Sequence, residues 1–478
     1  MANKEQIKEY IRDQITQADF RAQGYVFDAQ NKKRLNRNIF VRLHSYLEKF
    51  LSGNKAFRWI TLTGLRGAGK TTAMYQLYHS KKNIDAYFLI LPVDEVVETL
   101  GSSISEVLTV FEEIVGKSLS NLDKPLLLFL DEVQYDEKWG VTLKTLYDRS
   151  DKVFIFATGS AAVLMNSNPD IARRAIFEKM FPLSFTEFIK VKYQKTEIRG
   201  LASEIREAVF SSTSAKEVFD RVSSLQSKID RYYLDINRLE FEKYLNYGSL
   251  PFMIALDNEA LVYDQINKSL ERVVNKDLPQ MRSMIQETIS KIPAILYAIA
   301  DMDALNFTTL AEKFGISRPK VSEIFSALEQ AEVLHRIYPI GSHFKQVTQR
   351  PSKYLFSSPA FRAMYYKTIG NTITEQNARG KLLEDLVGMY LYRLFDKKPG
   401  FSFNYDAEKG GADFVIGVGD KRMVIEVGSN KTTYKQVIQT MKKVNAIYGI
   451  IISEKVDALE YNEEENAVKI PLNYFLLT

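Results

Sequence analysis

One short segment constrains the fold of this chain more than any other. Residues 64–71 read G-L-R-G-A-G-K-T, which fits the pattern G-x-x-x-x-G-K-[ST] without a mismatch. The run before it, 58–63, has the apolar and β-branched character of a buried strand, and 71–77 has the pattern of a helix start. A glycine-rich turn between a strand and a helix directs backbone N–H groups toward one point, which makes a cradle for phosphate. The sequence therefore predicts a nucleotide site at this loop.

Each residue type in the loop has an expected task. Lys70 is expected to reach the β- and γ-phosphates of ATP, and the Thr71 hydroxyl to ligate Mg²⁺. The alternative, a chance glycine turn, is disfavoured by the strand and the helix that flank the motif. The predicted nucleotide-binding residues are Gly64, Leu65, Arg66, Gly67, Ala68, Gly69, Lys70, Thr71 and Thr72.

A second motif supplies carboxylates. The apolar run 125–130 predicts a strand, and it is followed directly by Asp131 and Glu132. Asp131 is expected to help hold the Mg²⁺ ion, and Glu132 to polarise the attacking water as a general base. Taken alone, the segment also fits a buried strand that meets solvent at acidic residues. With a complete phosphate loop upstream, the catalytic interpretation is the stronger one.

Another predicted strand, 152–157, is followed by a segment with two small polar residues. Thr158 and Ser160 both qualify to sense the γ-phosphate or to position the attacking water. Sequence alone does not choose between them. Most strands end in small polar residues, so this signal is weak by itself.

Composition narrows the class of protein. The chain has 478 residues, enough for roughly three domains, and 45% of them are hydrophobic, as in a soluble globular protein. No apolar run is long enough for a transmembrane helix, so no membrane partner is expected. The absence of cysteine excludes disulfides, thiolate metal sites and cysteine nucleophiles, and it suits a cytoplasmic protein. A net charge of +5 permits nucleic-acid binding without requiring it.

Strand and helix patterns alternate in the first third of the chain. This alternation predicts an α/β fold, with a parallel sheet covered by helices on both faces. Residues 161–290 lose the strand signal and are expected to be helical. Expected strands lie at 58–63, 86–93, 125–131 and 152–158, and expected helices at 70–79, 104–115 and 138–148. The predicted division is an N-terminal helical extension (1–56), an ATPase core (57–190), a helical region (191–289), a winged helix (290–360) and an α/β domain (375–478).

The winged helix is predicted from three helices followed by a hairpin. The helices are 292–299, 308–315 and one that follows Ser317 as its N-cap; the hairpin would use 333–338 and 353–356. A recognition helix meets base edges near its start. Double-stranded DNA and a protein partner remain equally open for this module. The residues expected at its contacting end are Ser317, Arg318, Lys320 and Ser322.

The C-terminal pattern predicts a small α/β domain. A helix at 381–395 carries Glu384, and Asp413 and Glu426 lie on neighbouring predicted strands. These two carboxylates could share a hard cation such as Mg²⁺. A glutamate inside an apolar strand is also costly unless it is paired or liganded. Further expected elements are strands near 401–405, 413–418, 423–427, 447–453 and 468–477, and a helix near 434–444.

Taken together, the motifs resemble a large bacterial and archaeal family of AAA-type P-loop ATPases with a C-terminal restriction-endonuclease-like domain of unknown function. Order and spacing agree over nearly the whole chain. The segments that carry the resemblance are 63–72, 130–135, 157–160, 182–188, 247–251, 276–279 and 413–427.

The resemblance assigns Lys70, Thr71, Asp131 and Glu132 to the family's nucleotide site. The family also has an arginine soon after the segment at 157–160, and Arg173 and Arg174 stand in that place. Either arginine could act on a γ-phosphate in cis or from a neighbouring subunit, so a homo-oligomer is one expectation.

The resemblance breaks down in the C-terminal domain. The nuclease signature is D…E-x-K, whose lysine stabilises charge on the attacking hydroxide or on the phosphate. Here Gly428 stands at the lysine position after Glu426. Lys431 or Lys435 could replace it from the following segment. Because the motif lysine is lost, the resemblance implies a degenerate nuclease.

Two classes of function follow. The first is an ATP-hydrolysing switch or motor that binds DNA or protein through its C-terminal modules. The second is an ATP-licensed, Mg²⁺-dependent nuclease acting on DNA, for instance in defence. A small-molecule kinase is a distant third, because the Asp131–Glu132 pair favours hydrolysis by water and no acceptor pocket can be identified from the sequence.

Overall fold

The structure of the chain is a computed structural model. It describes residues 2–159, 169–256, 258–281, 284–302, 306–341, 351–369, 374–395, 398–430 and 433–478. The chain divides into two compact units. The first consists of residues 1–181 with 330–332, and the second of residues 182–329 with 333–478. Each unit has its own sheet and is described by itself.

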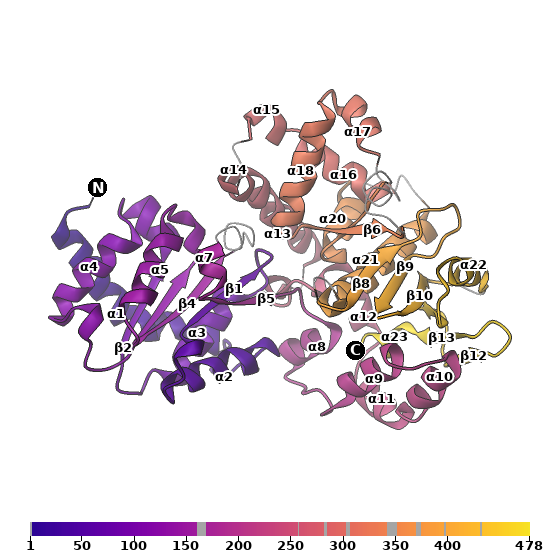
Figure 1. Cartoon of the computed structure of the whole chain (residues 1–478), viewed down its shortest axis with the longest axis horizontal. Coiled ribbons are helices and arrows are strands. Elements are labelled where there is room, and N and C mark those ends of the chain that lie inside the picture. Colours follow the sequence, from indigo (N-terminus) through magenta and orange to yellow (C-terminus); the bar gives the residue numbers. More distant parts are fainter. Residues whose placement is uncertain are drawn as a thin grey trace. The chain divides into compact units, whose positions relative to one another are not determined.

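The first unit is built around a parallel five-stranded sheet (Figure 1). Its strands are β1 (Trp59–Gly64), β2 (Tyr87–Pro92), β3 (Leu126–Asp131), β4 (Val153–Gly159) and β5 (Ile176–Met180). The order is β2-β3-β4-β1-β5, and every neighbouring pair is parallel. The predicted α/β fold is therefore confirmed. In this order β4 lies between the strand that enters the phosphate loop and the strand that carries the acidic pair.

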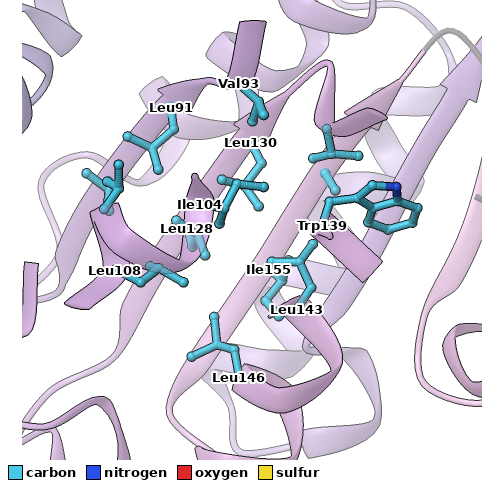
Figure 2. Close-up of a cluster of buried hydrophobic side chains, with 14 of the residues drawn as sticks. Leu91, Val93, Ile104, Leu108, Leu128, Leu130, Trp139, Leu143, Leu146 and Ile155 are labelled. Atoms are coloured by element: carbon cyan, nitrogen blue, oxygen red, sulfur yellow. The ribbon is translucent and has the colours of Figure 1, made fainter. Parts of the chain in front are cut away.

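Helices cover both faces of this sheet, because its strands are apolar on both sides. Leu128 and Leu130 of β3 belong to the core beneath α4 and α5, together with Trp139 (Figure 2). Phe129, the residue between the two leucines, faces the other way and contacts Tyr78 of α3. The helices of this unit are α1 (Lys4–Val26), α2 (Ile39–Leu51), α3 (Lys70–Lys81), α4 (Ile104–Val115), α5 (Trp139–Arg149) and the short α7 (Pro169–Ala172).

Strand β5 differs from the sequence-based expectation, which makes residues 161–290 helical. It pairs with β1 along the edge of the sheet, with Met180 opposite Gly64. Most of its side chains are only half-buried, and its sequence I-F-E-K-M lacks the apolar run of the central strands. An edge strand of this kind leaves little local signal, because its conformation depends on the partner strand.

The second unit combines many helices with a mixed eight-stranded sheet of order β12-β13-β11-β10-β9-β8-β6-β7. The strands are β6 (Leu334–Pro339), β7 (Lys353–Phe356), β8 (Phe401–Tyr405), β9 (Phe414–Val418), β10 (Lys421–Gly428), β11 (Tyr448–Ser453), β12 (Glu460–Asn462) and β13 (Ala467–Pro471). The helices are α8 (Phe185–Tyr193), α9 (Leu201–Phe210), α10 (Ala215–Ser223), α11 (Gln226–Tyr233), α12 (Leu239–Lys243), α13 (Glu259–Arg272), α14 (Leu278–Met281), α15 (Gln286–Ile289), α16 (Ile292–Asp301), α17 (Phe307–Phe314), α18 (Arg318–Gln330), α20 (Pro359–Ile369), α21 (Glu375–Phe395), α22 (Lys435–Val444) and α23 (Leu472–Phe475).

Two features of this sheet also differ from the expectation. Strands β6 and β7 form the predicted antiparallel hairpin, but β6 also pairs in parallel with β8, so the hairpin belongs to the C-terminal sheet. The strand expected at 468–477 ends at Pro471, where α23 begins. Pro471 is the N-cap residue of α23, with φ of −55° and ψ of 135°.

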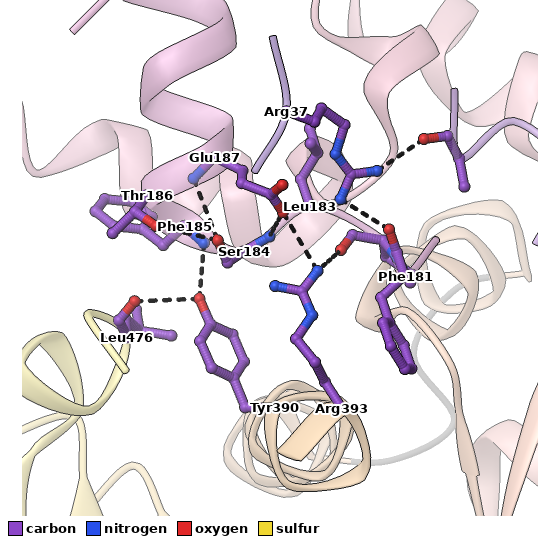
Figure 3. A network of polar contacts seen from close by, with 12 residues as sticks. Arg37, Phe181, Leu183, Ser184, Phe185, Thr186, Glu187, Tyr390, Arg393 and Leu476 are labelled. Atoms are coloured by element: carbon purple, nitrogen blue, oxygen red, sulfur yellow. Dashed lines mark hydrogen bonds and ion pairs between the residues drawn. The ribbon is translucent and has the colours of Figure 1, made fainter. Parts of the chain in front are cut away.

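A polar network secures the start of α8 inside the second unit (Figure 3). Ser184 caps the helix: its Oγ accepts the Glu187 N–H at 3.2 Å, and Glu187 Oε2 accepts the Ser184 N–H at 3.3 Å. Arg393 of α21 pairs with the same Glu187 carboxylate at 3.3 Å. The Tyr390 hydroxyl accepts the N–H of Phe185 at 2.7 Å and donates to the carbonyl of Leu476 at 3.2 Å. The motif at 182–188 thus joins three elements of this unit.

Among the described residues, no helix is both long enough and apolar enough to cross a membrane.

Candidate nucleotide site and a second carboxylate cluster

The phosphate loop connects the end of β1 to the start of α3, as the sequence predicts. Gly67 and Gly69 have φ values of 79° and 98°, which side chains other than glycine rarely adopt. Gly64 is required for a different reason: a β-carbon there would collide with the carbonyl oxygen of Met180 on β5. The glycine pattern of the motif therefore follows from backbone geometry at three positions.

Lys70 is folded over this loop. Its Nζ donates hydrogen bonds to the carbonyl oxygens of Gly64 at 3.0 Å and Leu65 at 3.3 Å, and the residue is only 4% exposed. Both acceptors are neutral carbonyls, so these bonds hold the ammonium at the loop without neutralising it. A buried cation held in this way suits an anionic ligand such as a triphosphate.

The expected Mg²⁺ ligands lie next to each other. The Thr71 hydroxyl, in the first turn of α3, donates to Asp131 Oδ2 at 2.7 Å. Burial and, after it, the neighbouring charge of Glu132 raise the pKa of Asp131 to about 6. A raised pKa means that the ionised form of this carboxyl group is disfavoured in its buried position. A hydroxyl beside such a carboxylate is a donor set that fits Mg²⁺.

Thr158 joins the two acidic residues. It lies at the end of β4 opposite Leu62 of β1, and it is fully buried. Its hydroxyl donates to Asp131 Oδ1 and accepts the backbone N–H of Glu132 at 3.1 Å. In this structure the hydroxyl therefore orients the acidic pair, which is a positioning task. Ser160, the other candidate at this strand end, lies outside the described residues.

Glu132 is held in an unusual conformation. Its φ of 54° is left-handed, which costs a non-glycine residue about 1–2 kcal/mol. Its carboxylate accepts a hydrogen bond of 2.6 Å from Gln134 Nε2. Strained backbone of this kind is concentrated at functional sites, where the surrounding structure has to enforce it. Here the Thr158 hydroxyl and the Gln134 amide do so.

The two candidate arginines differ in their surroundings. Arg174 makes a two-point ion pair with Asp148 of α5, with distances of 2.8 and 2.9 Å. Arg173, one residue earlier, is exposed. Sequence position alone does not distinguish the two. A role at a γ-phosphate stays a prediction for both.

Sequence reasoning missed Arg37. The basic segment 32–37 suggests a solvated turn, and Arg34 fits that expectation, since it is exposed and donates to the carbonyl of Phe27. Arg37 is half-buried and reaches the phosphate loop. It donates to the carbonyl of Ala68 at 2.8 Å and to that of Phe181 at 2.9 Å (Figure 3). No local pattern marks an arginine that acts through contacts so far along the chain.

In the second unit, the predicted carboxylates do come together. The backbone N–H of Asp413 donates to Glu426 Oε2 at 3.2 Å, and Asp413 Oδ2 accepts the N–H of Val427 at 2.9 Å. Glu426 is 1% exposed. Sequence reasoning missed Lys353, the first residue of β7, whose ammonium contacts Glu384 and lies 3.3 Å from Asp413 Oδ1.

The lysine found beside these carboxylates in the described part of the chain is Lys353, and neither lysine named from the sequence is seen there. Of the two lysines expected to take this task, Lys435 is exposed at the start of α22, and Lys431 lies outside the described residues. Among the described residues, no group of three or more histidine, aspartate or glutamate side chains is arranged to hold a metal ion. The described carboxylates at this position are therefore compensated by a lysine.

The predicted recognition helix is α18. Three of its four expected contact residues, Ser317, Arg318 and Ser322, are exposed at its start, while Lys320 is half-buried. Helices α16 and α17 and the β6–β7 hairpin lie where the winged-helix pattern places them. The assignment as a winged helix stays a prediction.

Comparison with known proteins gives the class of the first unit. A profile for an AAA domain matches residues 56–189, and one for a domain of unknown function (DUF8612) matches residues 238–366. Together with the parallel sheet and the phosphate loop, the first match makes this unit an AAA P-loop ATPase domain.

One relative covers nearly the whole chain. The chain is 33% identical over 476 residues to the uncharacterized protein MJ1637 of Methanocaldococcus jannaschii, covering 99% of this chain and 94% of the relative. The chain therefore belongs to the same family of AAA-domain proteins as MJ1637.

Solved structures show only a distant likeness. The Thermotoga maritima RuvB Holliday junction branch migration motor matches with 17% identity and a TM-score of 0.30, covering 63% of this chain and 90% of that one. AMPPCP-bound DnaA from Aquifex aeolicus matches with 14% identity and a TM-score of 0.27, covering 64% and 92%. TM-scores this low do not establish a shared function.

Proposed function

We propose that this protein is an ATP-hydrolysing switch or motor that engages DNA or protein through its second unit. One observation carries the proposal. At the end of the parallel strands, a glycine loop with an embedded lysine lies beside a hydroxyl–carboxylate pair, and a second carboxylate follows directly. These are the parts that phosphoryl transfer to water requires: phosphate binding, metal binding and a base.

The chain's residues divide the work as follows. Lys70 and the loop N–H groups hold the phosphates, Thr71 and Asp131 provide oxygen ligands for Mg²⁺, and Glu132 accepts a proton from the attacking water. Bound Mg²⁺ would supply positive charge to the phosphate oxygens. Thr158 orients Asp131 and Glu132 relative to each other through its hydroxyl group.

The partner is proposed to bind near the start of α18, where Arg318 is exposed. A cationic side chain at the start of such a helix contacts phosphates or base edges when the module binds a duplex. The same surface would serve a protein partner. Duplex DNA is the occupant to test first, because its binding has a characteristic salt dependence.

ATP turnover measured with and without double-stranded DNA tests the proposal. We expect Mg²⁺-dependent turnover that changes when a duplex is added. An ATP turnover rate that is the same with and without DNA would favour a protein partner. No turnover of Mg-ATP under either condition would refute the proposed function.

The second unit is proposed to be a degenerate nuclease, because Gly428 removes the motif lysine. The alternative is an ATP-licensed, Mg²⁺-dependent nuclease, and Lys353 favours it, since this ammonium lies beside Asp413. A plasmid-cleavage assay with Mg²⁺ and ATP separates the two. We expect no cleavage; robust cleavage that Asp413→Ala eliminates would establish the nuclease.

A further inference from the structure

Arg37 of the first unit belongs to none of the sequence motifs, yet it contacts the phosphate loop. Arg37 lies between α1 and α2, and its two terminal nitrogens bond to different segments: Nη1 to the carbonyl of Ala68, Nη2 to the carbonyl of Phe181 (Figure 3). Hydrogen bonds from a charged guanidinium are stronger than those between neutral groups. The fork of the guanidinium fixes both carbonyls with respect to each other.

The bond to Ala68 affects the phosphate loop directly. The peptide unit between Ala68 and Gly69 is planar and trans, so its C=O and N–H point in opposite directions. A guanidinium that holds the Ala68 carbonyl therefore also sets the direction of the Gly69 N–H. Because glycines in this loop have broad conformational freedom, a hydrogen bond from outside the loop helps to keep this N–H in a binding orientation.

The bond to Phe181 connects the same arginine to the last residue of the segment 1–181. Phe181 follows β5, and it is the last residue of the first unit before Pro182 begins the second. Proline fixes its own φ and restricts the residue before it to extended backbone. These restrictions leave the backbone at 181–182 little freedom to absorb a shift of the Phe181 carbonyl.

Within the second unit, the next carbonyl is held in a similar way. Arg393 Nη2 donates to the carbonyl of Pro182 at 2.6 Å, and it also pairs with Glu187 in the capping box of α8. Displacement of Pro182 would therefore act on the first turn of α8.

We infer that Arg37 is a positioning residue of the nucleotide site, and that it transmits nucleotide occupancy from the phosphate loop to the connector at Phe181–Pro182. The inference rests on the proposed function, since it requires nucleotide binding at residues 64–72. It adds a regulatory route: phosphate bound to the loop N–H groups fixes the Ala68–Gly69 peptide, and Arg37 relays this to Phe181.

The chain offers a matched control. Arg34 belongs to the same basic segment, but it is exposed and bonds to Phe27. Arg34→Ala removes the same charge from the same segment without touching the loop. Arg37→Lys keeps the charge at position 37 but cannot hold two carbonyls in a fixed fork.

The test uses the full chain and a non-hydrolysable ATP analogue with Mg²⁺. Calorimetry measures the affinity, and hydrogen exchange of residues 181–193 is recorded with and without saturating analogue. In wild type we expect the analogue to slow exchange in this segment. Arg37→Ala should bind at least about tenfold more weakly, as expected for the loss of one charge-assisted hydrogen bond. At saturation its exchange response should be lost. For Arg37→Lys, the affinity and the exchange response should lie between those of wild type and Arg37→Ala. For Arg34→Ala, both should match wild type.

The outcomes distinguish this inference from the proposed function. If wild type binds no analogue, the proposed function fails, and the inference fails with it. If wild type binds but Arg37→Ala binds equally well and keeps the exchange response, the inference alone is overturned. If circular dichroism shows that Arg37→Ala does not fold, Arg37→Lys is compared with wild type instead. Equal affinity and an equal exchange response in these two proteins would then overturn the inference.

Discussion

The two units each contain a lysine next to carboxylates, but the lysines bond to different partners. Lys70 donates to two neutral backbone carbonyls, whereas Lys353 contacts the carboxylates of Glu384 and Asp413. The hydrogen bonds of the first ammonium bring it no opposite charge. The second is already neutralised by the protein. Similar residue types can thus form either a site prepared for an anion or an internally compensated cluster.

Replacing Glu132, the proposed base of the first site, should have the largest effect. Glu132→Gln keeps the shape of the side chain but cannot accept the proton of water. We expect ATP binding to persist and turnover to fall by about 10²–10⁴-fold. Glu137→Gln, an exposed neighbour, serves as the control. A fall of less than about tenfold would mean that Glu132 is not the base.

Removing the hydroxyl that orients the acidic pair should have a smaller effect. Thr158→Val takes away the donor to Asp131 and the acceptor for the Glu132 N–H, and we expect turnover to fall by about 10–100-fold. The matched control is Thr61→Val, since Thr61 is equally buried and its hydroxyl makes no hydrogen bond within the described part of the chain. Equal turnover in the two variants would contradict the positioning role.

Removing the cation of the second cluster should expose its carboxylates. Lys353→Met should lower the free energy of unfolding by about 1–3 kcal/mol, because Glu384 and Asp413 lose their partner. Mn²⁺ should then stabilise the variant more than it stabilises wild type, as measured by thermal unfolding. Lys469→Met, which takes a similarly buried lysine from Glu460, should show no such gain. If Mn²⁺ stabilises wild type and Lys353→Met alike, the lysine does not block the cluster.

The smallest effect is expected at α18. If this helix binds a duplex, changing Arg318 and Lys320 together to Ala should flatten the plot of log affinity against log salt. The slope should fall by about one for each phosphate that the variant no longer neutralises. The half-buried Lys320 should contribute less than Arg318. Unchanged affinity at several salt concentrations would favour a protein partner.

The parts of the molecule that the sequence predicts correctly are those that depend on local sequence patterns. The ends of β1, β3 and β4 lie within one residue of their expected positions, because a contiguous motif and apolar parallel strands leave a strong local signal. Asp131 and Thr158 meet because adjacent parallel strands end at the same edge of the sheet.

The features that the sequence does not predict depend on contacts between distant segments. Lys353 lies on β7 and reaches Asp413 only because β6 joins the hairpin to the C-terminal sheet. Arg37 lies in a segment whose composition suggests a solvated turn. Strand β5 is half-exposed at the edge of its sheet, so its residues carry little of the apolar pattern that marks β3 and β4. In each case the deciding partner lies far away in the sequence.

The most direct test of the central claim is whether residues 64–72 bind the nucleotide. Calorimetric titration of Mg-ATP into wild type and Lys70→Ala answers this. The account predicts saturable binding to one site per chain in wild type and none that can be detected in Lys70→Ala, because the variant lacks the ammonium held at the loop. Equal affinity of the two proteins for Mg-ATP would contradict it.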